Sequence, residues 1–313
     1  MNQEVGQPGF SSPRVLIPFI LVTLIWGWTW LVIKDQLGPV PAVWSVTYRF
    51  TVATIAMFAY ALATRASFRV GRNGHLLALA FGLPQFMLNF NFVYAAEEHV
   101  TSGLVAVVFA MLLVPNSLLA WAFLGHKPTP RFAIGSLITV TGTALLFVQE
   151  MRANPAGDSE VLIGIALTFG GLLSASVSNV LQATRAVKAR PIASMLALGM
   201  LYGTIADAIF AWVTTGPPVI EPRLGYLVGT LYLGLLGSAL AFTLYFAVIR
   251  AIGPGKAAYS GLLVPMIAMG LSTAFEGYHW STLAVAGGIL ALIGLFIALR
   301  SSRPGPTQQS SEV

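Results

Sequence analysis

The sequence predicts an all-α integral membrane protein with ten transmembrane helices, arranged as two inverted five-helix repeats. Composition is the first observation behind this prediction, because 56% of the 313 residues are hydrophobic and only 9% are charged. A soluble domain typically carries roughly 25% charged residues. The second observation is the length of the apolar runs, which match the roughly 20 residues that a helix needs to cross a bilayer. An internal repeat is the third.

Turns that contain proline, glycine or charge separate the apolar runs, as expected of connections between helices. Gly38-Pro39 and Lys127-Pro128 belong to two such turns. The segments 1–13 and 301–313 are polar, and we expect them to be disordered tails. The predicted spans are residues 15–34, 41–64, 75–96, 100–124, 131–149, 161–184, 191–214, 224–249, 256–277 and 280–300.

Basic residues lie mostly on one side of these spans. Of the 17 Lys and Arg, 13 lie on that side, and only Lys34, Arg152 and Arg223 lie on the other side, where most acidic residues gather. Cytoplasmic loops of membrane proteins are enriched in basic residues, so we expect both termini in the cytoplasm. Basic residues distributed in this way do not form a nucleic-acid patch. The 13 residues are Arg14, Arg65, Arg69, Arg72, Lys127, Arg131, Arg185, Lys188, Arg190, Arg250, Lys256, Arg300 and Arg303.

The two halves of the chain resemble each other at a spacing of about 150 residues. We place the repeats at 14–149 and 160–300, joined by a periplasmic connector at 150–159. Prolines and phenylalanines recur 150 residues apart, and a pair of glycines recurs 152 residues apart. The matches are Pro41 with Pro191, Pro115 with Pro265, Phe92 with Phe242, Gly135 with Gly287, and Gly142 with Gly294.

An odd number of spans in each repeat forces the second repeat to insert upside down relative to the first. Inverted repeats of this kind are a transporter architecture, in which substrate binds between the repeats near the membrane midplane. Duplication is also a general route to larger membrane proteins, so the repeat favours a carrier without establishing one.

Four amide side chains within the spans are candidates for binding a substrate, because polar groups are costly to bury in hydrocarbon. Gln85 and Asn89 are four residues apart and share one face of the third span. Asn179 and Gln182 lie in the sixth span. The alternative is that these amides hydrogen-bond to neighbouring helices and hold the bundle together.

Aromatic residues are further candidates for substrate binding. Trp26 and Trp30 share one face of the first span, where they are placed to stack on a substrate ring, whereas Trp28 points away from them. Tyr245 in the eighth span adds another ring. Tryptophans near span ends usually form an interfacial belt. The tryptophans that we assign to this belt are Trp44, Trp212 and Trp280.

Two pairs of residues are candidates for gating. Pro115 and Pro265 each remove a backbone donor and clash with the carbonyl four residues back, so we expect both to weaken their spans near the midplane. Tyr94 and Tyr245 are approximate mates in the repeat, so one ring would lie toward each mouth of the cavity. The alternative is that both tyrosines belong to the interfacial belt and face lipid.

Charged residues near the spans have simpler interpretations. We expect Arg49 and Asp207 to extend toward the outer surface, where water solvates their charges. The cluster Glu97-Glu98-His99 is interpreted as a solvated outer loop rather than a metal site.

The sequence offers no catalytic residue, metal site or cofactor site. It contains no cysteine, and its four histidines fall at span ends, so it lacks both a nucleophile with a base in reach and clustered metal ligands. An intramembrane enzyme and a non-transporting membrane scaffold are the alternatives to a carrier. The sequence indicates no particular oligomeric state.

Several of these features also carry a family resemblance. Trp26-Gly27, Arg49, the Phe92-x-Tyr94 end of the third span and the proline-centred fourth and ninth spans resemble the EamA-type drug/metabolite transporters. The chain is most similar to bacterial aromatic amino-acid exporters of that superfamily. Trp28-Thr29 and Gly125-His126 depart from the common Ser-Asn and Gly-Glu at those places.

This resemblance implies a bacterial inner-membrane carrier that exports small neutral or zwitterionic metabolites, above all aromatic amino acids, by alternating access. The cavity would lie between spans one, three, four, six, eight and nine. The expected partners are a small-molecule substrate and the lipid bilayer. Proton coupling and facilitated diffusion are both consistent with the sequence.

Overall fold

The computed structural model describes residues 12–125, 127–153, 158–252 and 260–300, and every regular element within these ranges is a helix. The predicted C-terminal tail, residues 1–11 of the predicted N-terminal tail and residues 154–157 of the predicted connector 150–159 therefore lie outside the described residues. Each backbone group in a bilayer needs an internal hydrogen-bond partner, which a helix supplies within one segment.

The helices of the first half follow the five predicted spans closely, and the third and fourth spans are each divided into several pieces. The elements are α1 (Pro13–Gln36), α2 (Ala42–Ala63), α3 (Gly71–Gly82), η1 (Leu83–Leu88), α4 (Asn89–His99), α5 (Ser102–Ala110), α6 (Leu113–Leu124) and α7 (Pro130–Ala153).

The helices of the second half have the same order, with one short extra helix, α9, in a connection. The elements are α8 (Asp158–Ala183), α9 (Arg185–Lys188), α10 (Ile192–Thr215), α11 (Leu224–Leu231), η2 (Tyr232–Leu240), α12 (Ala241–Ile252), α14 (Ser260–Phe275) and α15 (Thr282–Arg300). We call the end of the bundle where α1 begins the basic end, and the end where α1 stops at Gln36 the acidic end.

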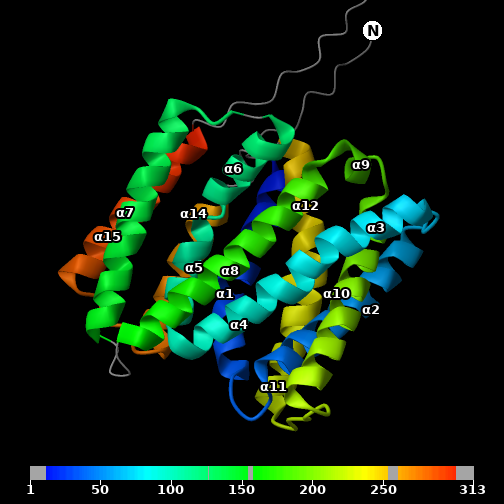
Figure 1. Ribbon diagram of the computed structural model, residues 1–313, viewed down its shortest axis with the longest axis horizontal. Coiled ribbons are helices and arrows are strands. Elements are labelled where there is room, and N and C mark those ends of the chain that lie inside the picture. The colour runs from blue at the N-terminus through cyan, green and yellow to red at the C-terminus, as the bar shows by residue number, and fades with distance from the viewer. Residues whose placement is uncertain (1–11, 126, 154–157, 253–259, 301–313) are drawn as a thin grey trace, which may run out of the picture.

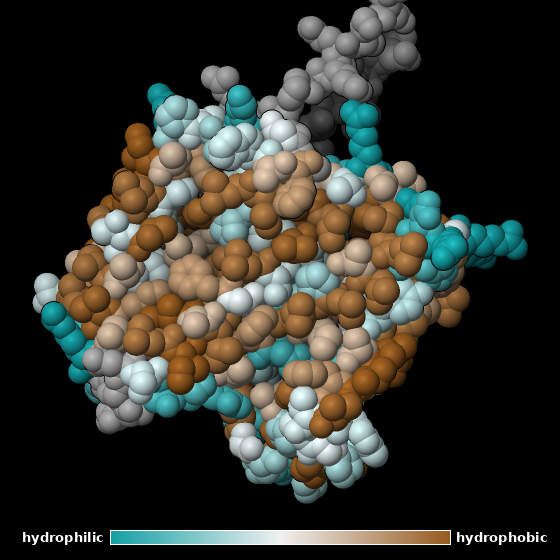
Figure 2. All heavy atoms as spheres, viewed as in Figure 1, coloured by the Kyte–Doolittle hydropathy of each residue, from teal (hydrophilic) through white to brown (hydrophobic). Residues whose placement is uncertain are grey.

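The bundle is apolar on its outside, as a membrane protein requires. Eight helical segments are long and apolar enough to cross a bilayer, and two shorter apolar helices, Leu263–Phe275 and Thr282–Ala298, lie in the positions of the ninth and tenth spans. Hydrophobic side chains cover most of the face in Figure 2, and hydrophilic side chains gather along its edges. The chain is therefore an all-α integral membrane protein, with ten apolar helical segments among the described residues.

Equivalent helices of the two halves pack against each other. In Figure 1, α7 and α15 form one edge of the bundle and α2, α3 and α10 form the opposite edge, with α1 between them. The start of α2 meets the end of α10, because Trp44 Nε1 donates to the Gly216 carbonyl at 3.2 Å. The start of α10 meets the end of α2, where Ser194 Oγ donates to the Ser67 carbonyl at 2.8 Å. These two equivalent helices are therefore antiparallel, as inverted repeats require.

Glycines let α7 and α15 approach closely. A Cβ added at Gly135 would lie 2.6 Å from the Gly294 carbonyl oxygen, and one at Gly142 would lie 2.6 Å from that of Gly287. Small residues at such positions allow helix backbones to touch in membranes. Gly135 is the repeat mate of Gly287 and Gly142 of Gly294, so each contact is the symmetry mate of the other, as in an isologous interface.

A hydrogen bond between Thr54 and Thr204, 3.2 Å between the hydroxyl oxygens, joins residues 150 positions apart. A residue that contacts its own repeat mate lies on or near the axis that relates the halves. The α2–α10 contact is therefore at the centre of the pseudo-two-fold arrangement.

Two π-helical segments interrupt the third and eighth spans at matching places, which the sequence analysis did not predict. These are η1 and η2, and they lie about 150 residues apart. A π-helix bonds each N–H to the carbonyl five residues back, and such segments occur frequently at functional sites. Their symmetric placement makes the middle of the bundle a candidate functional region.

The two prolines differ in their effect on the helices. The fourth span leaves α-helical geometry at Met111 and Leu112, just before Pro115, whereas α14 is continuous through Pro265. Pro115 has no N–H to donate to the carbonyl four residues back, that of Met111, and in a regular α-helix its ring would clash with that carbonyl. The gating role of both prolines stays a prediction.

Candidate functional site

Trp26 connects the first span to the eighth. Its indole Nε1 donates a hydrogen bond to the Gly237 carbonyl of η2 at 3.2 Å. Its ring lies 5.8 Å from Phe242 and 5.0 Å from Tyr245, measured between ring centroids. The structure thus brings two predicted substrate-binding residues, Trp26 and Tyr245, into one aromatic cluster. We call Trp26, Phe242 and Tyr245 the aromatic cluster.

The other tryptophans of the first span separate as the helical period requires. Trp30 packs on Phe109 of α5, with ring centroids 5.3 Å apart, and its buried Nε1 has no hydrogen-bond partner among the described residues. Trp28 is 43% exposed on the outside of the bundle. The prediction that Trp28 points away from Trp26 and Trp30 is confirmed.

The four predicted amides lie on three inner helical segments and differ in their partners. Gln85 on η1 and Asn89 on α4 are buried, and the side-chain carbonyl of Asn89 has no partner among the described residues. Asn179 on α8 reaches Asn116 on α6 at 3.5 Å, whereas Gln182 donates to Ser178 of its own helix at 3.1 Å. The side-chain carbonyl of Asn89 thus has unused hydrogen-bonding capacity within the described part of the chain.

Two cavities in the structure lie away from these residues. A groove of about 380 Å³ lies between α1 and α14 and is almost entirely apolar. A second cavity of about 220 Å³ lies at the acidic end, beside Tyr48 and Tyr226. Neither is lined by a predicted substrate-binding residue. The groove residues are Phe19, Ile20, Thr23, Leu24, Leu263, Met266 and Ile267.

Tyr94 is buried in the interior, so the alternative that placed it in a lipid-facing belt is wrong. Its hydroxyl donates to Gln36 Oε1 at 2.8 Å, and Gln36 Nε2 donates to Thr230 Oγ1 at 2.7 Å. This chain of hydrogen bonds ties α4 to α1 and α11 near the acidic end. Gln36 and Thr230, which complete this chain of hydrogen bonds, were not among the residues predicted from the sequence.

Arg49 is also buried, which contradicts the expectation that it extends to the outer surface. Its side chain is 2% exposed, and its Nε donates to Ser238 Oγ of η2 at 3.1 Å. The guanidinium carbon lies 4.2 Å from the centre of the Phe90 ring. The neighbouring helices enclose the side chain completely, so it has no path along which to reach water.

Asp207 is also buried, which contradicts the expectation that it extends toward the outer surface. Its carboxylate accepts hydrogen bonds from the Thr47 hydroxyl at 2.7 Å and from the Asn91 amide. These donors come from α2 and α4 and replace the water that a carboxylate needs. Asp207 therefore lies in the interior, where it links α10 to two other helices.

The interpretation of Glu97 as part of a solvated loop is wrong. Glu97 is 0% exposed, and Lys34 donates to its backbone carbonyl and, at 3.3 Å, to that of Val100. The Lys34 ammonium therefore occupies the carbonyl-rich end of α4, where a cation is favourable. Glu98 is exposed, and His99 pairs with Glu160 at 2.6 Å between Nδ1 and Oε2.

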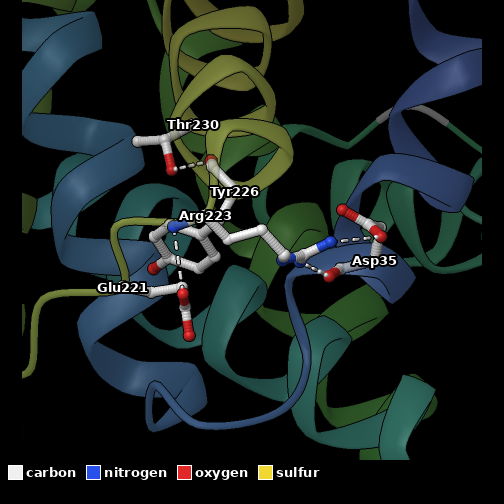
Figure 3. A network of polar contacts seen from close by, with 5 residues as sticks. All are labelled: Asp35, Glu221, Arg223, Tyr226 and Thr230. Atoms are coloured by element: carbon white, nitrogen blue, oxygen red, sulfur yellow. Dashed lines mark hydrogen bonds and ion pairs between the residues drawn. The ribbon is translucent and has the colours of Figure 1, made fainter.

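An exposed network joins the end of α1 to the start of α11 at the acidic end (Figure 3). Arg223 Nη1 lies 3.0 Å from Asp35 Oδ1, and Nη2 donates to the Asp35 carbonyl at 2.7 Å. The Asp35 carboxylate raises the pKa of the Arg223 guanidinium by hydrogen bonding and by charge. Glu221 accepts from the Arg223 backbone N–H at 3.0 Å. The end of α1 is thereby held to the start of α11.

Trp44 also differs from its prediction, whereas the other belt tryptophans do not. Trp44 is buried beside Tyr48 and bonded to Gly216, so it belongs to the α2–α10 contact rather than to a lipid-facing belt. Trp212 and Trp280 are exposed apolar rings near helix ends, in agreement with the interfacial assignment.

Comparison with known proteins identifies the family. A sequence model of the EamA-like transporter family matches the chain twice, over residues 14–148 and 162–300. The chain belongs to the EamA-like transporter family. As a member of this family, this EamA-like transporter resides in membrane lipid and has a small-molecule substrate. The family agrees with a transporter rather than with the intramembrane-enzyme alternative.

Relatives of this EamA-like transporter extend over nearly the whole chain. Protein PagO of Salmonella typhimurium is 25% identical over 288 residues, which are 91% of this chain and 92% of PagO. The inner membrane transporter YedA of Escherichia coli is 26% identical and covers 90% of both chains. A probable terminal-alkyne amino-acid exporter of Streptantibioticus cattleyicolor is 24% identical and covers 80% of this chain and 82% of its own length.

The fold of the EamA-like transporter also matches a solved structure. A crystal structure aligns with 91% of this chain and 96% of its own chain, with a TM-score of 0.65 and 18% sequence identity. At this identity the match supports the fold and carries no information on the substrate.

Proposed function

We propose that this chain is a bacterial inner-membrane carrier that exports small zwitterionic metabolites, above all aromatic amino acids, by alternating access. Both termini and the basic end would face the cytoplasm. The observation that carries the proposal is the aromatic cluster, which joins α1 of the first half to η2 and α12 of the second. A ring-bearing substrate stacks favourably on such side chains.

The position of the cluster suits a transport site. Substrate in inverted-repeat carriers binds where the two halves meet, often beside helices with interrupted backbone geometry. The cluster lies at such a place, next to the π-helical segment η2. The unpaired side-chain carbonyl of Asn89 and the indole Nε1 of Trp30 supply an acceptor and a donor within the same bundle. The relative named as an amino-acid exporter supports the same substrate class.

Gating is proposed to use the hydrogen-bond chain at the acidic end. Tyr94, Gln36 and Thr230 hold that end together in the described conformation. Opening toward the periplasm would break this chain, while Tyr245 would move across the path from the cytoplasm. Rocking of one half against the other around a fixed site would couple the two movements.

Flux into proteoliposomes tests the proposed function. The full chain should carry an aromatic amino acid saturably, and counterflow should separate a carrier from a channel. Trp26→Ala should weaken the apparent affinity by about two- to tenfold, because one aromatic contact contributes about 0.5–1.5 kcal/mol. Trp28→Ala removes the same side chain from the outer surface and should leave the affinity unchanged. An absence of flux for every amino acid would instead favour a scaffold or an enzyme.

A further inference from the structure

The Arg49 guanidinium is a buried charge without a full set of partners. It carries five N–H donors, of which Nε bonds to Ser238 at 3.1 Å, while Nη1 has no partner among the described residues. A buried charged group that lacks partners is strongly unfavourable. Such a group in a native structure therefore calls for an explanation, and a role in binding a ligand is one.

Acidic residues do not neutralise Arg49 directly. Tyr94 interacts with the guanidinium both electrostatically and through a side-chain hydrogen bond, and Glu97 and Tyr232 interact with it electrostatically. The ion pairs between described side chains with nitrogen and oxygen within 4.0 Å join other residues, namely His99 with Glu160 and Arg223 with Asp35. Arg49 is therefore oriented by its surroundings but is not locked into a salt bridge within the described part of the chain.

Two aromatic rings, those of Phe50 and Phe90, lie close to the Arg49 guanidinium. Its carbon lies 4.2 Å from the Phe90 ring centre and 5.4 Å from that of Phe50. Stacking of this kind satisfies the flat face of a guanidinium by cation–π attraction and leaves the N–H edge available. The edge is the part that recognises a carboxylate, through parallel hydrogen bonds to its two oxygens.

Gly237 places this edge next to the aromatic cluster. The Gly237 carbonyl accepts the hydrogen bond from Trp26, and a Cβ added at Gly237 would lie 3.7 Å from Arg49 Nη2. The indole and the guanidinium thus approach the same glycine of η2. An amino acid is long enough to place its carboxylate at Arg49 and its side-chain ring at the cluster.

We propose that Arg49 binds the carboxylate of the transported molecule, which makes carboxylate-bearing zwitterions the substrate class. This inference rests on the proposed function. Arg49 is buried in the described conformation, so substrate reaches it when the halves move apart during the transport cycle. The positive charge is then neutralised by substrate in the state in which the cavity is open to it.

Matched pairs of compounds test this inference in proteoliposomes that contain the full chain. Each of the 20 standard amino acids, beginning with phenylalanine, is compared with its carboxamide, in which a neutral group replaces the carboxylate. Wild-type protein should prefer the amino acid by about 10- to 100-fold in kcat/KM, as expected for a hydrogen bond to a charged group. Arg49→Gln should lose this preference, and Arg49→Lys, which keeps the charge, should retain part of it.

Asp207→Asn is the matched control, because it also removes a buried charge. Asp207 bonds to Thr47 and Asn91, whereas Arg49 bonds to Ser238, so the two sites share no hydrogen-bond partner among these residues. It should leave the preference for the amino acid unchanged. Equal transport of amino acid and carboxamide by wild-type protein would overturn the inference while leaving the carrier function intact. This measurement uses wild-type protein alone, so it does not depend on whether a variant folds. A preference that persists in Arg49→Gln would also overturn it. If wild-type protein moves no amino acid, the proposed function fails and this inference fails with it.

Discussion

The hydrogen bond from Tyr94 to Gln36 should control how often the acidic end opens. Tyr94→Phe removes the hydroxyl that donates at 2.8 Å and leaves Gln36 Oε1 as an acceptor without that donor. Gln36 is 1% exposed, so water does not replace the donor while this end is closed. Leaving a buried acceptor unsatisfied costs about 1–3 kcal/mol.

This cost should apply to the closed state alone, because water would reach Gln36 once the acidic end opens. The equilibrium should therefore shift toward the open state by about 5- to 150-fold. The assay is the labelling rate of Asn89→Cys by an impermeant thiol reagent added on the acidic-end side. Since the wild-type chain contains no cysteine, the label reports on that position alone.

Tyr48→Phe is the control for this experiment. Its hydroxyl donates to the Val219 carbonyl at 2.9 Å in an exposed position at the same end of the bundle. Exposed hydrogen bonds are readily replaced by water, so the labelling rate should not change. A folded Tyr94→Phe variant with an unchanged labelling rate would refute the assignment of Tyr94 to the gate.

Three further predictions concern orientation, packing and the buried carboxylate. In whole cells, Ser67→Cys should resist an impermeant thiol reagent and Pro218→Cys should react, and the reverse pattern would invert the proposed topology. Gly142→Leu should separate α7 from α15 and lower the thermal unfolding temperature, because even a Cβ there would lie 2.6 Å from the Gly287 carbonyl oxygen; an unchanged temperature would contradict the close contact. Asp207→Ala leaves the Thr47 hydroxyl and the Asn91 amide without their acceptor and should destabilise the protein by about 1–3 kcal/mol, measured by thermal unfolding in detergent; an unchanged unfolding temperature would show that these buried hydrogen bonds contribute little.

The spans could be predicted from the sequence because bilayer thickness sets the length of an apolar helix. The facing of Trp26, Trp28 and Trp30 followed from the helical period, and the glycines of the fifth and tenth spans were recognised as repeat mates from their spacing. These features depend on local sequence and on the membrane, so no knowledge of the partner helices was needed.

The buried charges could not be predicted in the same way. The sequence shows that Arg49 is in a span, but its burial depends on Ser238 and Phe90, which come from other helices. Asp207 likewise depends on Thr47 and Asn91. Snorkelling is the sound expectation for an isolated helix, and tertiary partners overrode it here.

The π-helical segments were missed for another reason. Hydrophobic periodicity does not distinguish an α-helix from a short π-helix, since both bury similar residues over one or two turns. The glycines of η2 and Pro84 in η1 were the available signals. The role proposed for η2 depends on the folded structure, in which Gly237 lies next to both Trp26 and Arg49.

Counterflow in proteoliposomes tests the central claim most directly. Vesicles that contain the purified chain and are loaded with an unlabelled aromatic amino acid should accumulate the labelled one transiently, with a saturable initial rate. Vesicles loaded with buffer should not show this overshoot. Equal, unsaturable uptake in both preparations, or no uptake of any amino acid, would contradict the account of the chain as an alternating-access carrier of amino acids.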